Sequence, residues 1–453
     1  MNYPYEPKFS VKSRLIKSKI SKRDSVTIAM KLISKFFVVF ATLLCICLLI
    51  HPKLVYAQSQ QLIYAEPQPI KIGMSAAFTG ASRSLGIELY QGSMAYFDYI
   101  NRSGGIKGRP IVIQAYDDGY NPLPAIQNTT RLIEKDQVFL LFNYLGTPTV
   151  TRVLPLFIKY QNKPIFLFFP FTGAQSHRQS PYNQFVFNLR PSYREETAGL
   201  VKNFLKIGRK KIAVFYQIDA YGRSGWDGVK RQLKAEGFKI VGEATYRRGT
   251  EYHSSFKAQV DILKKAEPDA IISIGSYQAC AGFIRDARTS NWDVPIANLS
   301  FVGSESLLDL LLKTSRSTGI DYTQNLINSQ VVPSYENIAL PGVKEYRNLR
   351  DAYQQKPPPN LVPEPYQNLP YSFVSFEGFL NAKLLVKILQ DSPNLSDRKN
   401  LKTTLENIHD FDLGLDVPVE FNAQSHQGLH KIYYMTVKDN HFVPIFSWKQ
   451  WSK

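Results

Sequence analysis

Cysteine is scarce in this chain, and the scarcity excludes two classes of protein. The 453 residues contain 3 Cys, of which Cys45 and Cys47 lie in the one long apolar run and Cys280 lies in the body. Three cysteines do not build a disulfide framework or a cysteine-rich zinc module. The hydrophobic share of 44% and the charged share of 20% are ordinary for globular proteins, which excludes a collagen, a coiled coil and a disordered chain.

Long blocks of like charge are also missing. The net charge is +18, but ten basic residues and only two acidic ones fall in residues 1–57, so much of the excess lies outside the body of the chain. The body carries a mildly basic balance without a run of five or six like charges. A nucleic-acid partner is therefore not expected.

The only long apolar run is too short for a membrane span. Residues 36–50 (FFVVFATLLCICLLI) make 15 residues, whereas a spanning helix needs about 20. Basic residues precede the run, and a small-x-small pattern ends at Ala57. This pattern predicts a secretory signal over residues 1–57 that is cleaved after Ala57, with Met30 as an alternative start. The alternative is an uncleaved anchor helix, and both interpretations place the body in the periplasm or outside the cell.

Motifs of the common enzyme classes are absent. The sequence contains no G-x-G-x-x-G after its first predicted strand, no phosphate-binding P-loop, no H-E-x-x-H, no C-x-x-C and no G-x-S-x-G. His426 and His430 have i, i+4 spacing, but Gly428 between them indicates a turn, so we expect no metal or other cofactor there. Cys280 is predicted to be a small buried core residue. The sequence thus favours a protein that is not an enzyme, with an exported α/β hydrolase as a rival.

Short apolar runs alternate with amphipathic segments from residue 70 onward. Predicted strands are 70–75, 110–116, 138–141, 165–169, 211–216, 239–246, 270–274 and 295–302. Predicted helices are 87–100, 122–135, 149–160, 194–206, 225–236, 254–266, 279–289 and 375–389. Continuous apolar strands that alternate with helices predict an α/β fold with parallel sheets covered on both faces.

The alternation occurs in two similar series. The strand that begins at Lys71 is echoed at Lys211, and the glycine at Gly86 is echoed at Gly225. This weak repeat predicts two similar lobes. A proline-rich segment at 354–370 predicts an exposed loop, and residues 417–446 predict two β segments around Gly428.

Polar residues follow two neighbouring strands of the first series. Gly146 and Thr147 follow the third strand, and Thr172 and Gly173 follow the fourth. Ligands bind at the carboxyl ends of strands in open α/β sheets, and helix N-termini attract anions. These residues predict a binding site for a carboxylate, which we call the carboxylate seat. The alternative at each position is a threonine that only caps a helix.

The second series offers complementary chemistry. Tyr221, Tyr277 and Glu305 follow three of its strands. Two aromatic rings and a carboxylate suit an ammonium group through cation–π contact and charge pairing. The alternatives are a first-turn helix acid at Glu305 and tyrosines without a ligand role.

Several stretches carry a family resemblance over residues 68–450. They are KIGMSAAFTG at 71–80, INRSGGIKGR at 100–109, FNYLGTPT at 142–149, YQIDAYGRSGWDGV at 216–229 and LSFVGSESL at 299–307. The sequence resembles the leucine/isoleucine/valine-binding family of extracytoplasmic solute-binding proteins, which serve ABC importers. The resemblance implies two Rossmann-like lobes joined by a three-strand hinge, the type I periplasmic binding protein fold. Its expected domains are lobe 1 (68–190 plus 327–427) and lobe 2 (191–326 plus 428–450).

The resemblance also implies roles for residues of the interlobe cleft. Thr147 matches the position that binds the ligand's α-carboxylate, Thr172 and Gly173 contact the same group, and Glu305 holds the α-ammonium. Tyr221 and Tyr277 form the wall of lobe 2, and Leu85 covers the ligand side chain. The chain departs from the family pattern at Gly-Thr-Pro-Thr, where Gly146 and Thr147 replace the usual paired serines, and in the phenylalanine-rich stretch 169–174.

These observations predict a solute-binding protein that closes two lobes on a small, branched-chain-like amino acid. The implied partner is an ABC transporter permease in the membrane. Two alternatives keep the fold: a cleft that binds an amide or urea, and a ligand-binding protein that serves a sensor.

Overall fold

The computed structural model describes residues 30–46 and 68–453. Residues 30–46 form one helix whose side chains are exposed along its length. No helix in the described ranges is long and apolar enough to cross a bilayer. The cleavage site predicted after Ala57 and most of the predicted signal lie outside the described residues. The remainder, Gln68–Lys453, is one compact unit.

The first sheet of this unit has five parallel strands in the order β2-β1-β3-β4-β5. The strands are β1 (Ile70–Ala76), β2 (Ile111–Asp117), β3 (Leu140–Phe142), β4 (Leu167–Phe168) and β5 (Val186–Phe187). Their residues are mostly buried, because a parallel sheet is covered by helices on both faces. The accompanying helices are α2 (Arg83–Arg102), α3 (Pro122–Glu134), α4 (Thr147–Lys159), α10 (Pro341–Tyr353), α11 (Phe373–Asp391) and α12 (Lys399–Glu406). We call this part lobe 1.

The second sheet has seven strands in the order β12-β11-β10-β9-β8-β6-β7. The strands are β6 (Ile212–Gln217), β7 (Glu243–Tyr246), β8 (Ala270–Ile274), β9 (Ile296–Asn298), β10 (Leu326–Gln330), β11 (Tyr433–Lys438) and β12 (His441–Pro444). The pairs among β6–β10 are parallel, whereas β11 pairs antiparallel with both β10 and β12. The helices of this lobe 2 are α5 (Tyr193–Lys206), α6 (Ala220–Ala235), α7 (Lys257–Lys265), α8 (Tyr277–Thr289) and α9 (Ser304–Thr318).

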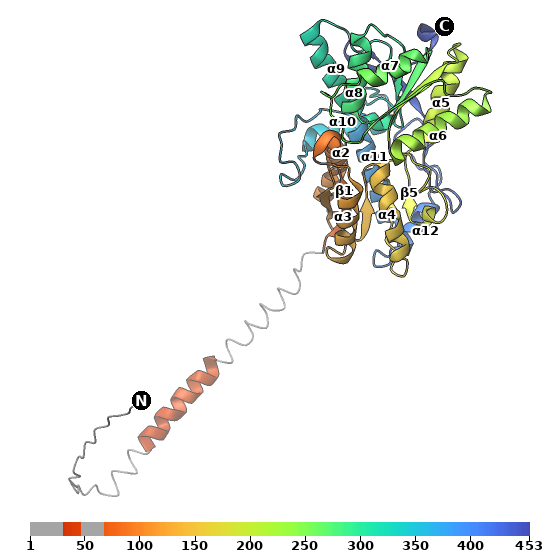
Figure 1. Cartoon of the computed structure of the whole chain (residues 1–453). Helices are drawn as coiled ribbons and strands as arrows, with labels where there is room; N and C mark the ends of the chain where they lie inside the picture. The colour runs from red at the N-terminus through yellow and green to blue at the C-terminus, as the bar shows by residue number, and fades with distance from the viewer. Residues whose placement is uncertain (1–29, 47–67) are drawn as a thin grey trace, which may run out of the picture. The chain divides into compact units, whose positions relative to one another are not determined.

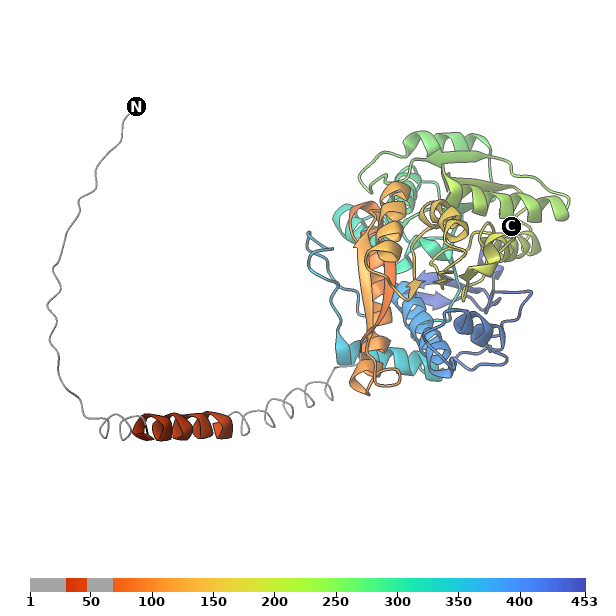
Figure 2. The same ribbon diagram turned by 90° about the horizontal axis from the view of Figure 1, so that it is seen from below.

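The chain passes between the lobes three times. It leaves β5 for α5, returns from β10 to α10, and leaves α12 for β11. Figures 1 and 2 show the resulting arrangement, with α2–α4 in lobe 1 and α5–α9 in lobe 2. The sequence predicted a boundary between the lobes at residues 326 and 327. That boundary would fall within strand β10, which pairs with β9 and β11 of lobe 2.

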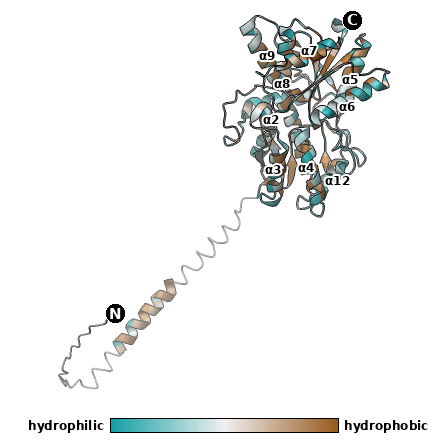
Figure 3. Ribbon diagram, in the orientation of Figure 1, coloured by the Kyte–Doolittle hydropathy of each residue, from teal (hydrophilic) through white to brown (hydrophobic). Residues whose placement is uncertain are grey.

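Helix α11 is a mostly buried helix of lobe 1. It packs along α2 in close contact, and Gly92 of α2 meets the backbone of Ser375 so closely that a Cβ would lie 1.8 Å from the carbonyl oxygen. Most of its residues are buried, which explains why no single apolar stripe marks it in the sequence. Figure 3 shows hydrophobic colour along the strands and hydrophilic colour on many of the outer helix surfaces.

The predicted α/β fold with two lobes is confirmed, and the strand predicted at 270–274 coincides with β8. The two β segments predicted around Gly428 are wrong in position. The hairpin turns instead at Asp439 and Asn440, whose φ values of 50° and 63° suit the left-handed tight turn that Asp and Asn tolerate. Gly428 lies in the third crossing, where Phe421 leaves no room for a Cβ.

Candidate functional site

The predicted carboxylate seat of lobe 1 is a pair of buried threonines. The Thr147 and Thr172 hydroxyl oxygens are 2.6 Å apart, and the two residues are 2% and 0% exposed. Thr147 is the first residue of α4, and the N-cap is Gly146, which has no side chain to cap the helix. The capping alternative therefore does not describe Thr147. The hydroxyl pair lies beside the free N–H groups at the start of a helix, where an anion is favoured.

Each glycine of this seat lies directly against a tyrosine. A Cβ on Gly146 would lie 2.0 Å from the Tyr120 ring, and a Cβ on Gly173 would lie 2.7 Å from Tyr193. Gly146 also has a φ of 90°, which a residue with a side chain rarely adopts. Glycine is required at both positions because the rings need the space.

Lobe 2 meets this seat with aromatic rings. Tyr221 lies in the first turn of α6, where the Asp219 carboxylate caps the helix by accepting from the Tyr221 N–H at 3.0 Å. The Tyr221 ring centroid is 4.6 Å from that of Phe301 and 5.1 Å from that of Tyr193. Phe301, in the short turn between β9 and α9, reaches two rings of lobe 1. The distances are 5.8 Å to Tyr120 and 5.4 Å to Phe171.

We call these five residues the aromatic cage: Tyr120, Phe171, Tyr193, Tyr221 and Phe301. All five are at most 2% exposed. The hydroxyl groups of its three tyrosines have no hydrogen-bond partner among the described residues. Burial raises the pKa of each of these tyrosines, so the hydroxyls stay protonated and are available as donors. A buried hydroxyl without a partner is costly, and a ligand group that accepts from it removes that cost.

Two further predicted residues lie next to the cage. Leu85 and Tyr277 both approach Gly303, two residues after Phe301, from α2 and α8. The lobes touch here through hydroxyl pairs, Ser82 with Ser276 at 3.0 Å and Ser84 with Ser306. A cavity of about 290 Å³ opens beside Tyr277 and is also lined by the proline-rich segment at Tyr366.

Glu305 lies against the N-terminus of a lobe 1 helix. Its carboxylate accepts a hydrogen bond from the Phe373 N–H at 3.2 Å, at the N-terminus of α11. Burial raises the pKa of Glu305 to about 7. The structure thus brings together Gly146, Thr147, Thr172, Gly173 and Tyr221, places Leu85 and Tyr277 beside them, and ties Glu305 to the first turn of a lobe 1 helix.

A charged cluster adjoins the cage. The buried Arg190 guanidinium forms ion pairs with Glu196 of α5 and Glu377 of α11, both at 3.6 Å. The Glu196 carboxylate also accepts from the Ser300 N–H at 2.9 Å and from the Ser329 hydroxyl at 2.9 Å. The Arg190 guanidinium carbon lies 4.6 Å from the Phe171 ring centroid, so the cluster and the cage are in direct cation–π contact.

Sequence reasoning did not single out Tyr120, Tyr193, Phe301 or Arg190 as site residues. Tyr120 follows β2 and Phe301 follows β9, so the strand-end rule that selected Thr147 also applies to them. Tyr193 and Arg190 lie in the first crossing between the lobes. Arg190 follows β5, a strand of two residues that the apolar pattern did not predict, and Tyr193 is the first residue of α5, so the strand-end rule could not be applied to either from the sequence.

His426, His430 and Cys280 do not form a shared site in the described part of the chain. His426 contacts Glu406 at 2.9 Å, whereas His430 contacts Glu195 at 2.6 Å, so the two rings have separate partners. No group of three metal-ligating side chains occurs among the described residues. Cys280 is fully buried, as predicted, and burial raises the pKa of its thiol to about 12, which leaves it an inert thiol.

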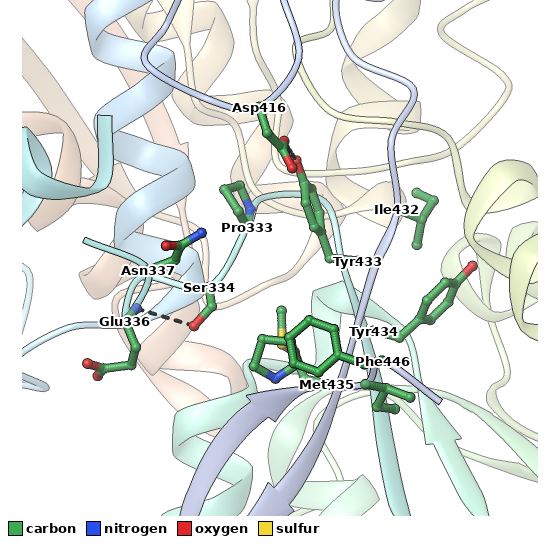
Figure 4. Close-up of a pocket in the computed structure, with 12 residues that line it drawn as sticks. Pro333, Ser334, Glu336, Asn337, Asp416, Ile432, Tyr433, Tyr434, Met435 and Phe446 are labelled. Carbon is green, nitrogen blue, oxygen red and sulfur yellow. Dashed lines mark hydrogen bonds between the residues drawn. The ribbon is translucent and has the colours of Figure 1, made fainter. Parts of the chain in front are cut away.

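One cavity of the described unit lies away from the cage. It has a volume of about 540 Å³ and lies between the second crossing and the hairpin of β11 and β12, as Figure 4 shows. Its lining includes Pro333, Tyr433, Met435 and the exposed Phe446. None of the predicted site residues lines it.

Comparison with known proteins identifies the class. The family model described as "Periplasmic binding protein" matches residues 69–441, and this chain belongs to that family. It is therefore a type I periplasmic binding protein, a member of a family whose proteins bind solutes and function outside the cytoplasm.

Curated relatives and solved structures agree with that class. An amino acid binding protein of Pseudomonas aeruginosa is 25% identical over 48% of this chain, and the match spans 57% of that protein's length. A Leu/Ile/Val-binding protein homolog 7 of Brucella abortus is 24% identical over 71% of this chain and 76% of its own. The crystal structure of a possible leucine/isoleucine/valine-binding protein from Rhodopirellula baltica is 31% identical, with a TM-score of 0.73 over 86% of this chain and 99% of that one.

One solved structure shares the fold at low identity. A branched chain amino acid ABC transporter protein from Thermus thermophilus with bound valine has a TM-score of 0.70 over 84% of this chain and 96% of its own, at 14% identity. At that identity the likeness concerns the architecture alone.

Proposed function

We propose that this chain is the extracytoplasmic solute-binding component of an ABC importer and that it captures a small amino acid between its lobes. The observation that carries the proposal is the pair of buried threonine hydroxyls, Thr147 and Thr172, at the N-terminus of α4. The neighbours of Thr172 in the chain, Phe171 and Gly173, lie against the rings of Phe301 and Tyr193 in the opposite lobe. The names of relatives, which include amino acid and Leu/Ile/Val-binding proteins, support the same class of ligand.

The proposed capture divides the ligand between the lobes. The α-carboxylate accepts hydrogen bonds from Thr147, from Thr172 and from the N–H groups at the start of α4. The ammonium pairs with the Glu305 carboxylate, which lies on the first turn of α9. Neither lobe completes the set of partners, so the ligand favours the closed arrangement, as in hinge-closing binding proteins. The closed protein then docks on a membrane permease.

Hydrogen bonds of ordinary strength suffice to bind such a ligand. Hydrogen bonds to charged groups contribute roughly 1.5–3 kcal/mol each. A micromolar complex needs about 8 kcal/mol in total. Three or four such bonds reach that value after the cost of ordering, and no covalent step is involved.

The test is a calorimetric titration of the purified full chain with leucine, isoleucine, valine and the other common amino acids. Glu305→Gln should weaken the tightest of these by ten- to a hundredfold, because a buried ammonium loses its charged partner. Glu267→Gln is the matched control, since the Glu267 side chain is 83% exposed and precedes β8, at the end of that strand opposite to its carboxyl end. Unchanged affinity of Glu305→Gln would remove the proposed ammonium site.

A second ligand class is favoured by the position of Glu305. Its carboxylate already accepts a hydrogen bond from the Phe373 N–H. A ligand that has no ammonium group, such as an amide, would therefore also be compatible with the threonine pair. Acetamide and urea in the same titration test this alternative: binding of an amide together with failure of every amino acid would replace the first proposal.

A further inference from the structure

The proline-rich segment 354–370 is a long loop that has no part in the proposed capture. It runs from the end of α10 to the start of α11; every residue of it is described, and none belongs to a helix or strand. Figure 1 shows it in light blue beside α2. A loop longer than about 12–15 residues without secondary structure of its own is uncommon and usually has a function. We call residues 354–370 the strap.

The strap forms one wall of a cavity that both lobes line. This cavity has a volume of about 290 Å³, and Tyr366 and the strap residues after it lie along it beside Ser84 of α2. The facing wall comes from lobe 2 and includes Tyr277 of α8 and Ser306 of α9. Tyr277 is also one of the residues that the sequence assigned to the cleft. The strap therefore bounds the space between the lobes on one side.

One buried carboxylate fastens the strap to lobe 1. Glu88 of α2 is 1% exposed and accepts hydrogen bonds from the Tyr366 hydroxyl at 3.0 Å and from the Leu369 N–H at 3.4 Å. The Ser372 hydroxyl, just after the strap, donates to the same carboxylate at 3.0 Å. Arg350 pairs with it at 3.6 Å and donates to the Leu369 carbonyl at 3.2 Å. Because a buried carboxylate without partners is costly, a strap that detaches must leave as a unit and admit water to Glu88.

The strap is linked to lobe 2 through one hydroxyl. The Ser84 hydroxyl contacts the Tyr366 hydroxyl at 3.0 Å and also the Ser306 hydroxyl of α9. A serine hydroxyl has one donor and two acceptor sites, so Ser84 can bond to both partners at once. Ser84 and Tyr366 belong to lobe 1, and Ser306 belongs to lobe 2. Separation of the lobes breaks the Ser306 contact and removes one member of the hydroxyl chain that ends at the strap.

The prolines make the strap stiff. They stand at positions 357, 358, 359, 363, 365 and 370. Each proline ring fixes φ near −65°, and proline-rich segments act as semi-rigid spacers. A stiff segment loses little conformational entropy when it docks, so a few hydrogen bonds suffice to hold it or release it.

We propose that the strap is a lid on the interlobe cleft, which closes the cavity beside Tyr277 while Tyr366 bonds to Glu88 and Ser84 and opens it when those bonds break. The inference rests on the proposed function, because a lid needs a solute to retain. It adds to lobe closure a second element that controls exchange between the cleft and water. The residue that fastens this lid is Tyr366, which belongs to neither the carboxylate seat nor the aromatic cage.

Thiol labelling of the full chain tests the lid without any ligand. The reporter is Leu310→Cys, which places a thiol in the lobe 2 wall of the cavity. Its reaction with N-ethylmaleimide, followed by peptide mass spectrometry, should become about fivefold faster when Tyr366→Phe is added, because the strap loses the hydrogen bonds of that hydroxyl. Cys280 of α8 is fully buried and reports unfolding, so its labelling should stay unchanged.

Tyr371→Phe is the matched control variant. The Tyr371 hydroxyl donates to Asp351 at 2.7 Å, just beyond the strap, and Tyr371 does not line the cavity. This variant should leave the labelling of Leu310→Cys unchanged. If Tyr366→Phe does not fold, Glu364→Gln replaces it, since it weakens the 2.8 Å ion pair between the strap and Arg83 at an exposed site. A rise in labelling of about twofold is then expected, and no rise overturns the lid.

Binding kinetics connect the lid to the solute. The probe is L-leucine, or the common amino acid that binds tightest in the calorimetric titration. Stopped-flow fluorescence should show that the probe dissociates about fivefold faster from Tyr366→Phe, whereas Tyr371→Phe releases it as the original chain does. An unchanged dissociation rate would overturn the lid.

The outcomes separate this inference from the proposed function. Labelling of Leu310→Cys that does not respond to Tyr366→Phe overturns the lid and leaves amino-acid capture standing. Faster labelling with Cys280 still protected, while no common amino acid binds, supports the lid and overturns amino-acid capture. Equal acceleration at Leu310→Cys and Cys280 indicates general unfolding and overturns the lid.

Discussion

Two buried polar regions, the charged cluster and the aromatic cage, touch where Arg190 meets Phe171, and they differ in how their carboxylate and hydroxyl oxygens are satisfied. In the charged cluster, the carboxylate of Glu196 has partners from Arg190, Ser300 and Ser329, all supplied by the chain, while Nε and Nη1 of Arg190 have no hydrogen-bond partner among the described residues. In the aromatic cage, three tyrosine hydroxyls have none among the described residues. The carboxylates of the first region join the lobes through Arg190, and under the proposed function the hydroxyls of the second are the groups that a ligand would engage. Removing a group should therefore reduce stability in one region and ligand affinity in the other.

The largest expected effect follows from Arg190→Leu. This change leaves the Glu196 and Glu377 carboxylates buried without their shared cation, and breaking such a pair costs about 3–5 kcal/mol. The free energy of unfolding from urea denaturation should fall by that amount. Arg194→Leu is the control, because Arg194 pairs with Asp227 at a half-exposed site and should lose about 1 kcal/mol or less. Equal losses in the two variants would show that the cluster has no special role.

A pH-dependent effect should appear at Glu377. Burial raises the pKa of this carboxyl to about 7 in the folded protein, above the value of 4.5 expected when it is unfolded. The stability that protonation contributes is therefore fully present below pH 4.5 and is lost as the pH rises through about 7.

The neutral side chain of Glu377→Gln has no such dependence. The unfolding free energy is measured for the variant and for the original chain at pH 5 and at pH 8. The difference between the two proteins should shift in favour of the variant by about 1–3 kcal/mol from the lower to the higher pH. Because other carboxylates titrate in both proteins, only this difference is diagnostic. A constant difference across the range would contradict the raised pKa.

Thr147→Val should affect binding without unfolding the protein. The variant keeps the shape of the residue but removes one hydroxyl of the threonine pair, and the Thr172 hydroxyl keeps its contact with the Ala174 N–H at 3.3 Å. We expect about a tenfold loss of affinity for the best-binding amino acid, since one hydrogen bond to a carboxylate disappears.

The melting temperature of the ligand-free Thr147→Val protein should change little. Thr129→Val is the control, because the Thr129 hydroxyl is buried against Ala125 and Tyr144, away from the cage, and its loss should leave affinity unchanged. A large loss of stability in ligand-free Thr147→Val would favour a structural role for this hydroxyl.

The smallest effect on stability is expected for Tyr221→Phe. Because the Tyr221 hydroxyl has no partner, its removal should leave the unfolding free energy unchanged or slightly higher while ligand affinity falls. Tyr346→Phe is the matched variant, because it removes a buried tyrosine hydroxyl that has partners. The Tyr346 hydroxyl contacts the Ser375 hydroxyl at 2.5 Å and accepts from the Ser372 N–H. That variant should lose about 1 kcal/mol, measured by thermal denaturation.

Local sequence signals predicted much of the fold and one side of the site. The strand at 270–274 and the helix at 122–135 are visible because buried strands are apolar and an amphipathic helix repeats every 3.6 residues. Thr147 and Thr172 follow successive strands, so the strand-end rule places them near each other. The turn at Asp439 and Asn440 was missed because Gly428 gave a stronger turn signal than the Asp-Asn pair that the hairpin uses.

By itself, the sequence determined that two α/β series follow one another, that polar residues lie at the ends of their strands, and that no common catalytic motif is present. Only the tertiary structure decided that Phe301 meets Tyr120 and that Arg190 joins α5 to α11. It also directed the Glu305 carboxylate to the Phe373 N–H. Periodicity reports which side of an element is buried, whereas contacts between residues hundreds of positions apart depend on how the three crossings set one lobe against the other.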